Sequence, residues 1–294
     1  MKRTAGENVF NVFNLIVITV LGMLCLLPML NVLAISFSSS FAVNRNEVTL
    51  IPVGFNLRAY RFLLESTRLW RACFITFQRV VLGTAINMAL IVTCAYPLSK
   101  PNIKFRFRTV YAWYFAFTIL FSGGLIPLFI LILNLGLMDT RWALILPGAL
   151  PVFNMLLMLN FFRAIPVSLE EAAIIDGASH FRVLTHIYLP CSLPAIATIT
   201  LFCIVGHWNS WFDGIIYSNR LESYPLQSYL QTIIVGLNLM HNEMDLDRQL
   251  LLGELDSRNI RCAQIIIAII PIACVYPWLQ KYFVSGIVLG SVKE

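Results

Sequence analysis

Three polar side chains interrupt the apolar run from Cys73 to Leu98: Gln78, Arg79 and Asn87. Arg79 follows Arg71 by eight positions, roughly 12 Å along a helix, which places it near the middle of any helix that crosses a bilayer. An ionisable group at that depth is costly and is therefore a functional candidate. A guanidinium can bind a carboxylate through two parallel hydrogen bonds, and the two amides can complete a polar cavity. The alternatives are an ion pair between helices and a helix boundary misplaced by a turn.

A second group lies between Gly206 and Tyr217, where aromatic side chains stand beside an amide and a carboxylate: Trp208, Asn209, Trp211 and Asp213. Sugars present CH faces and hydroxyl edges, which aromatic rings and polar groups together can satisfy. An aromatic belt at a membrane interface explains the tryptophans equally well, but explains Asn209 and Asp213 less easily. Both interpretations stay open from the residues alone.

A third group lies in residues 165–190, which are too polar to stay in lipid and too apolar for a free linker. We expect them to fold as a docked element. Ser168 followed three positions later by Glu171 is a capping-box pattern, which predicts a short helix from Leu169 that ends at Gly177. One stripe of this helix contains small residues, so another surface can approach it closely: Leu169, Ala172, Ala173 and Asp176.

The composition indicates that membrane helices hold these groups. Of 294 residues, 59% are hydrophobic and 12% charged, against about 45–50% and about 25% in an average soluble domain. Lipid must therefore solvate much of the chain. The net charge of +6 does not indicate nucleic-acid binding, because the basic residues flank apolar runs and form no single stripe. The seven cysteines include no CxxC pair and no metal-ligand spacing to histidine, so we expect them to pack.

The apolar runs predict an all-α polytopic protein with six transmembrane helices in one domain, residues 1–294. Gly123 and Gly124 before Pro127, and Pro190 with Pro194, could mark broken helices or kinks forced by packing. The loops that carry most of the remaining polar sequence are 163–186 and 218–261. The expected spans are about 9–35, 73–98, 110–133, 142–162, 187–217 and 265–283.

Lys and Arg are denser in the connections on the side of both termini, and they crowd into the loop from Lys100 to Arg108. The positive-inside rule therefore predicts cytoplasmic termini and a cytoplasmic loop 163–186. Loop 218–261 is then extracytoplasmic. In it we expect a short helix within Tyr229–Met240, followed by the acidic stretch Asn242–Asp247, and it is the expected outer contact surface.

The third group resembles a known family signature, in which E-A-A is followed by three residues, G, nine residues and I-x-L-P. Glu171-Ala172-Ala173, Gly177, Ile187 and Leu189-Pro190 match it without a gap. The signature is typical of inner-membrane permeases of binding-protein-dependent ABC importers. The sequence WNSWF at 208–212 and the ending from Tyr276 resemble the carbohydrate branch, including the smaller permease of maltose importers, and the length and tail are similar to permeases of oligosaccharide and alginate importers.

The resemblance implies a bacterial inner-membrane subunit that imports carbohydrate but is no enzyme. Residues Glu171, Ala172, Ala173, Asp176 and Gly177 would couple it to the ATPase. The implied partners are a homologous second permease, two ATP-binding subunits that hold ATP and Mg, and an extracytoplasmic solute-binding protein. The chain itself has no GxxxxGK[ST] sequence and needs no cofactor. The rival interpretation is a self-sufficient carrier or channel that uses Arg79 and Asp213 for ion coupling; a membrane-embedded hydrolase lacks a readable catalytic set.

Overall fold

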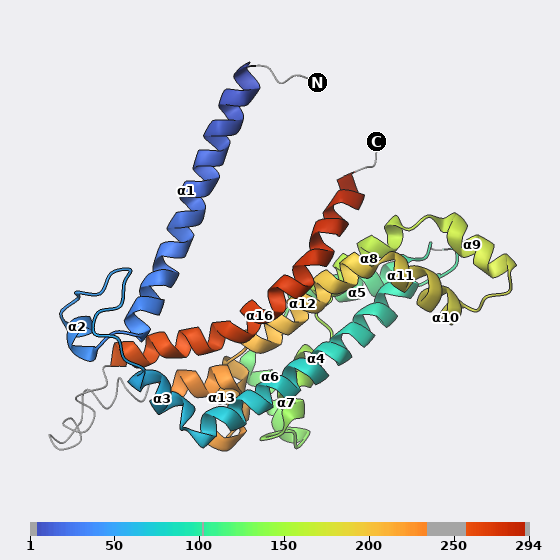
Figure 1. Ribbon diagram of the computed structural model, residues 1–294. Coiled ribbons are helices and arrows are strands. Elements are labelled where there is room, and N and C mark those ends of the chain that lie inside the picture. Colours follow the sequence, from blue (N-terminus) through green and yellow to red (C-terminus); the bar gives the residue numbers. More distant parts are fainter. Residues whose placement is uncertain (1–4, 102, 234–256, 292–294) are drawn as a thin grey trace. The chain divides into compact units, whose positions relative to one another are not determined.

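The computed structural model describes residues 5–101, 103–233 and 257–291, and every regular element in these ranges is a helix (Figure 1). The expected all-α class is confirmed. Three helices are long and apolar enough to cross a membrane, and the number rises to six if each of three bent helix pairs counts as one span. The six segments coincide with the six apolar runs of the sequence.

The second span is longer than its apolar run. It forms α4 (Thr67–Ser99), which begins well before Cys73. Hydropathy marks only the part of a helix that can lie in lipid, whereas the backbone continues helically through the charged turn that contains Arg68 and Arg71. The helix therefore extends more than one turn beyond the predicted span, whose start near Cys73 stays a prediction of where the helix enters the lipid.

The third span is broken where two glycines precede a proline. Helices α5 (Arg108–Leu120) and α6 (Leu125–Asn134) meet at an angle of 109°. Gly124 has a φ of +85°, a conformation that L side chains rarely adopt, so a residue without Cβ is needed at this turn. Of the two interpretations of Gly123-Gly124, the structure selects the break.

The fifth span is also broken. It starts with α10 (His180–Val183), the π-helical turn η2 (Leu184–Tyr188) and α11 (Leu189–Cys191), and it bends by 83° into α12 (Leu193–Asn209). The break falls at Ser192, between the two prolines that the sequence analysis singled out. The following α13 (Phe212–Tyr217) is a separate helix, so residues 187–217 are not one rod.

The chain divides into two compact units, residues 1–69 with 232–270 and residues 70–231 with 271–294. In the first unit, Asn259 donates to the carbonyls of Ile35 (2.9 Å) and Ser38 (2.8 Å) and thereby joins two segments that are far apart in the sequence. The exposed apolar length of α1 is what lipid or another subunit would cover. The unit contains α1 (Ala5–Ser36), α2 (Ser40–Asn44), α3 (Arg58–Leu64) and the start of α16 (Ser257–Ser291).

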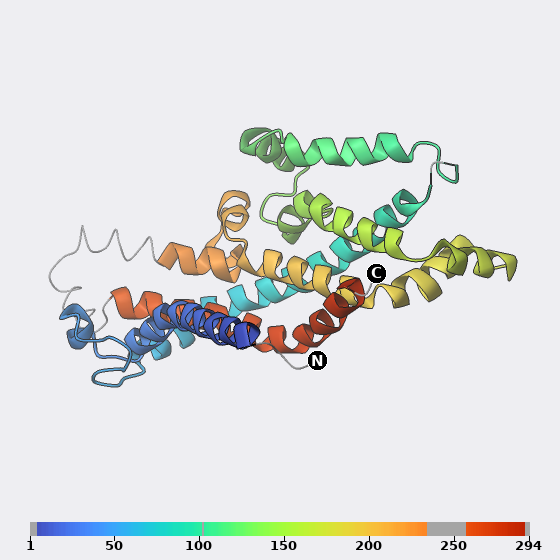
Figure 2. The same ribbon diagram turned by 90° about the horizontal axis from the view of Figure 1, so that it is seen from above.

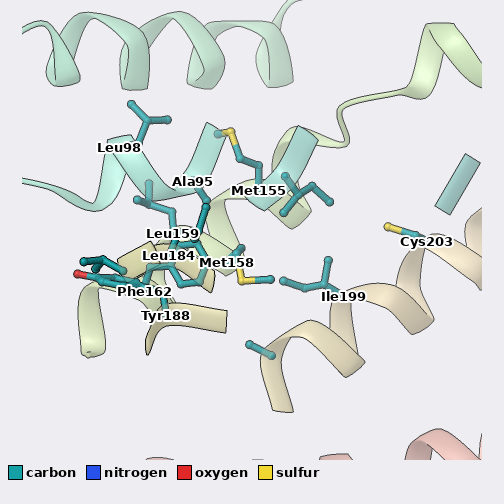
Figure 3. Packing of buried hydrophobic residues seen from close by; sticks show 13 residues of the cluster. Ala95, Leu98, Met155, Met158, Leu159, Phe162, Leu184, Tyr188, Ile199 and Cys203 are labelled. Carbon is teal, nitrogen blue, oxygen red and sulfur yellow. The ribbon is translucent and has the colours of Figure 1, made fainter. Parts of the chain in front are cut away.

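The second unit holds the main core, which joins α4, α8, η2 and α12 (Figure 3). Met155, Met158 and Ile199 are fully enclosed. Within this unit α9 and α10 project at one end of the long helices, and α6, α7 and α13 lie toward the other end (Figures 1 and 2). Its further helices are α7 (Arg141–Ile145), η1 (Leu146–Gly148), α8 (Val152–Ala164), α9 (Val167–Ile175) and η3 (Leu221–Ser223).

The start of the predicted outer loop is helical over residues 226–233. This overlaps the helix expected from Tyr229. The acidic stretch 242–247 and the rest of the expected helix lie outside the described residues.

Candidate functional site

A cavity of about 410 Å³ lies in the second unit among α4, α8, α12 and α13. Its apolar walls include Leu128, Leu144 and Phe202, which fits a cavity inside a membrane protein. A few polar groups converge on it, as in most small-molecule sites: Arg79, Asn87, Asn154, His207, Ser210 and Asp213.

Arg79 and Asp213 form an ion pair at this cavity. Both guanidinium Nη atoms face the carboxylate, and Nη1 lies 3.1 Å from Oδ1. The Arg79 side chain is 4% exposed and that of Asp213 22%. Asp213 also accepts from Ser210 Oγ and from the backbone N–H of Gly214, both at 2.9 Å. The carboxylate thus keeps two donors without the arginine, whereas Arg79 Nε is buried and has no hydrogen-bond partner.

Asn87 lies on α4 eight positions after Arg79 and connects this helix to α12. With its amide oriented to satisfy both ends, Asn87 accepts from His207 Nε2 (3.2 Å) and donates to the carbonyls of Gly83 (2.9 Å) and Ala149 (3.1 Å). The two helices approach closely here, because a Cβ on Gly83 would lie 2.5 Å from His207 Nε2. Gly83 is therefore required for this helix contact.

The structure brings together only part of the predicted set. Arg79 and Asn87 from the first predicted group and Asp213 from the second line one cavity. Gln78 is half-buried on the same helix but outside the cavity lining, and its Oε1 is buried without a partner. The aromatic part of the second group also lies outside the lining; Asn209 and Trp211 are exposed and Trp208 is half-buried.

His207, Cys203, Asn154 and Ser210 line the cavity and were not selected from the sequence. Asn154 donates to Cys203 Sγ at 3.5 Å across α8 and α12. One signal was available, because Asn154 and His207 are isolated polar residues inside apolar runs, like Arg79 and Asn87.

The loop signature forms the helix α9 near the expected position. Glu171, Ala172 and Asp176 are exposed, and Ala173 packs partly against the core. The capping-box prediction was wrong: the helix begins at Val167, behind Pro166, and no side chain caps it. Proline fixes a helical φ and needs no N–H at this end, so the chain enters the helix without the Ser168 hydroxyl.

Gly177 ends α9 as predicted, with φ +81°. The N–H of Gly177 donates to the carbonyl of Ile174 (3.0 Å) and that of Ala178 to the carbonyl of Ala173 (2.9 Å). This pair of bonds is the Schellman motif, which fixes the direction in which the chain leaves the helix.

Glu170, the neighbour of the signature glutamate, is the buried residue of α9. Its Oε2 accepts from Lys100 Nζ (2.7 Å) and Tyr188 Oη (2.8 Å), and its Oε1 from Lys104 Nζ (3.4 Å). The side chains of Lys100 and Glu170 are 8% and 3% exposed. The sequence analysis missed Glu170 because adjacent residues differ by about 100° around a helix, and only the phase of the helix decides which one is buried.

Burial and pairing shift both ionisable groups. Burial raises the pKa of Glu170, but hydrogen bonds from Lys100 and Tyr188 and the charges of Lys100 and Lys104 outweigh it, so the pKa lies below its ordinary 4.5. Burial lowers the pKa of Lys100 by more than the bond and charge of Glu170 raise it. The carboxylate is therefore ionised at neutral pH and held by charged hydrogen bonds.

Comparison with known proteins identifies related chains. Residues 104–288 match the family described as binding-protein-dependent transport system inner membrane component. The chain is also 39% identical over 272 residues to the polygalacturonan/rhamnogalacturonan transport system permease protein YtcP of Bacillus subtilis strain 168, covering 90% of this chain and 92% of that protein.

Solved structures are similar as well, and two of them are informative. One is a chain of a bacterial ABC transporter involved in the import of the acidic polysaccharide alginate, with a TM-score of 0.84, 34% identity, and coverage of 96% of this chain and 99% of that one. The other comes from a bacterial alginate ABC transporter in complex with a periplasmic protein that holds an alginate pentasaccharide. Its TM-score is 0.58 at 16% identity, with 93% of each chain covered, so it supports the fold alone.

Proposed function

The chain belongs to the family of binding-protein-dependent transport system inner membrane components, and from this premise we propose that it forms half of the path of an ATP-driven importer for acidic oligosaccharides. As a permease subunit it is a non-catalytic, multi-pass component of the bacterial inner membrane. The finer statements about cargo, coupling and sidedness rest on the cavity and on α9.

The Arg79–Asp213 pair carries the proposal for the cargo. A buried guanidinium that lines a cavity can hold a carboxylate with two hydrogen bonds. Asp213 occupies that position now, and its bonds to Ser210 and Gly214 would keep two donors on Oδ1 when a ligand carboxylate takes its place, while Oδ2 would exchange its bond from Arg79 for one from another donor. Arg79 Nε offers one further donor without a partner. A uronic acid provides such a carboxylate on each sugar ring.

Two of the similar proteins support an acidic cargo. One is named for polygalacturonan, a polymer of uronic acids, and another comes from a transporter for the acidic polysaccharide alginate. The cavity volume of about 410 Å³ lies within the range of about 300–1,000 Å³ for small-molecule sites. A second, homologous permease would provide the other half of the path.

Coupling to ATP hydrolysis falls to α9. The exposed residues Glu171, Ala172 and Asp176 offer one face to an ATP-binding subunit, and the Schellman motif at Gly177 keeps the helix from unwinding at its end. A rigid helix can transmit a displacement that a loose loop would absorb. The positive-inside rule places α9 and both termini in the cytoplasm.

The remaining partners follow from the same arrangement. Two ATP-binding subunits would bind ATP and Mg, since the residues that could cradle phosphates are missing from this sequence. A solute-binding protein would dock on the opposite side, at the loop that starts with Ser218. The self-sufficient carrier, with Arg79 and Asp213 in ion coupling, is the alternative and would need none of these partners.

The test uses the complex purified from its host through a tag on this chain and reconstituted in vesicles with its solute-binding protein. Four labelled probes separate the candidates: oligogalacturonate, an alginate pentasaccharide, a galactooligosaccharide and maltotriose. We expect ATP-dependent uptake of an acidic probe in preference to both neutral ones. Uptake without ATP or copurified subunits would support the carrier instead, and preference for a neutral probe would reject the acidic cargo while leaving the importer intact.

The coupling role of α9 has its own variant. Glu171→Gln is expected to lower uptake and to leave ATP hydrolysis poorly linked to it, with normal amounts of assembled complex. The matched control is Glu65→Gln, which changes an equally exposed carboxylate outside this helix. Equal uptake by the two variants and the parent protein would contradict the role of Glu171.

A further inference from the structure

Glu170 joins three segments of the second unit at one carboxylate. The carboxylate belongs to α9, Lys100 follows the last residue of α4, and Tyr188 ends the π-helical turn η2 of the fifth span. Each of these two partners bonds Oε2 within 2.8 Å. The bonds therefore connect α9 to the end of α4 and to η2, two of the elements that form the core.

The Lys100 ammonium is enclosed from the other side by aromatic rings. Its Nζ lies 4.0 Å from the ring centroid of Tyr96 and 4.0 Å from that of Tyr188. The two rings meet edge to face at 5.1 Å, and Phe162 packs on Tyr188 at 5.4 Å. The Lys100 ammonium thus contacts a carboxylate and the faces of two aromatic rings, and these contacts restrict where its side chain can lie.

We expect the buried Lys100–Glu170 pair to fix the relative positions of the helices more than it stabilises the fold. Desolvation of a buried ion pair offsets much of its attraction, and fixing a register is the best-attested use of buried ionic groups. A fully bonded polar cluster also stiffens the elements that share it. Without Glu170, α9 would keep only its partly buried residue Ala173 against the core, because its remaining side chains are mostly exposed.

We propose that Glu170 is a positioning residue that locks α9, the end of α4 and the start of the fifth span into one rigid body. The two adjacent glutamates then have different tasks: Glu171 faces outward to a partner, and Glu170 faces inward and passes the displacement on. Because Arg79 lies on α4, a movement of α9 shifts the cavity with it. The role of Glu170 in coupling rests on the proposed function, whereas the rigid connection of the three segments does not depend on it.

The test measures the rigid body directly. Spin labels on unnatural amino acids at the exposed positions 82 on α4 and 174 on α9 report their distance in the assembled complex, with ADP or with a nonhydrolysable ATP analogue. We expect one narrow distance that is the same with either nucleotide. Glu170→Gln removes the charge at nearly constant shape and should broaden the distribution and make it depend on the nucleotide. As a separate variant, Lys100→Arg keeps the charge of the cation and should largely retain the narrow distance.

Uptake per ATP hydrolysed provides the functional readout, with labelled oligogalacturonate as probe. We expect Glu170→Gln to lower this ratio at least fivefold, and Glu65→Gln to leave it unchanged. If Glu170→Gln fails to assemble, the pair Lys100→Met with Glu170→Met buries no lone charge and is expected to assemble with a broadened distance. A narrow, nucleotide-independent distance in that pair or in Glu170→Gln would overturn the proposal.

Failure of the proposed function gives a different result. If the unaltered complex takes up no probe with ATP, the importer or its cargo is wrong, while the spin-label distances still decide the role of Glu170. If the unaltered complex transports and the variants keep its distance and ratio, only the role of Glu170 is rejected.

Discussion

The two buried ion pairs of the second unit are built from the same kinds of groups but differ in how completely they are satisfied. Glu170 has a donor at both oxygens, and its lysine is held between two rings. Arg79 has a bonded carboxylate, but its Nε has no partner and it borders a cavity. The Asp213 side chain is 22% exposed, whereas that of Glu170 is 3% exposed.

The difference shows what each pair can do. A closed cluster cannot accept a ligand without being dismantled, so it suits the transmission of force. An ion pair beside a cavity, in which the arginine has an unpaired donor and the carboxylate accepts from two further groups, can exchange its carboxylate for one on a ligand. Charge alone would not separate the two roles, but the exposure of the carboxylate and the number of hydrogen-bonded atoms do.

The largest effect is expected from Lys100→Met, which leaves Glu170 buried without its main partner. Breaking a buried pair in this way costs about 3–5 kcal/mol. We expect a corresponding loss of hydrogen-exchange protection in α9 of the purified complex. Addition of Glu170→Met should restore only part of the protection, because it removes the lone buried charge but not the loss of the bonds that hold α9. A single variant with unchanged exchange would show that the closed cluster does not hold the helix.

Arg79→Gln tests the open pair. Hydrogen bonds to charged groups contribute about 1.5–3 kcal/mol each, and about 1.4 kcal/mol corresponds to a factor of ten. We therefore expect uptake of oligogalacturonate to fall by about 10–100-fold at subsaturating concentration. A galactooligosaccharide serves as the comparison. Equal losses for both sugars would mean that Arg79 shapes the cavity but does not recognise a carboxylate.

Gly83→Ala tests the contact between α4 and α12 at His207, next to the Arg79–Asp213 pair. The added Cβ would come within 2.5 Å of His207 Nε2, and the ring cannot yield without losing its bond to Asn87. Overpacking of this kind costs about 1–3 kcal/mol, which a lower melting temperature of the complex would reveal. Gly22→Ala is the control, since nothing lies within 4 Å of a Cβ there.

Acid should release α9 from the core. The folded-state pKa of Glu170 lies below its ordinary 4.5, so its contribution to stability is complete above pH 4.5 and disappears as pH falls through the lowered value. Limited proteolysis of loop 163–186 between pH 7 and pH 3 should show this transition. In Glu170→Gln the acid transition should be missing and cleavage should be faster throughout; an unchanged acid profile would rule out Glu170 as its source.

The smallest effect is expected at an exposed pair. Arg71 Nη1 lies 2.9 Å from Glu222 Oε2, but the side chains are 58% and 63% exposed. Exposed pairs contribute about 0–1 kcal/mol, so Arg71→Gln should change the melting temperature far less than Lys100→Met. A shift as large as that of the buried pair would mean that exposure is a poor guide to importance in this protein.

Much of this arrangement could be predicted from sequence because it follows from composition and spacing. The apolar runs located the six segments, and Gly123-Gly124 and the Pro190/Pro194 pair marked the two strongest breaks. Arg79, Asn87 and Asp213 stood out since polar groups in apolar runs are costly. Their joining into one cavity required the angle between broken helices, which no local pattern contains.

Other features depended on helix phase and packing. Glu170 and Glu171 are indistinguishable in sequence, and only the facing surface of Lys100 and Tyr188 selects the first for burial. Ser168 matched a capping pattern, but the preceding proline already set the start of the helix. Trp208 and Trp211 were chosen for their chemistry, but neither lines the cavity, whereas Ser210 and Asp213 in the same stretch do.

Helix α4 carries the exposed Arg71, then Arg79 and Asn87, and ends one residue before Lys100. Its 33 residues span roughly 50 Å as a single rod. A slip of one residue along this rod would move every one of these side chains by about 1.5 Å and turn it by about 100°. The relative positions of these four side chains are therefore fixed by the helix. An insertion or deletion between any two of them would move one out of contact with its partner.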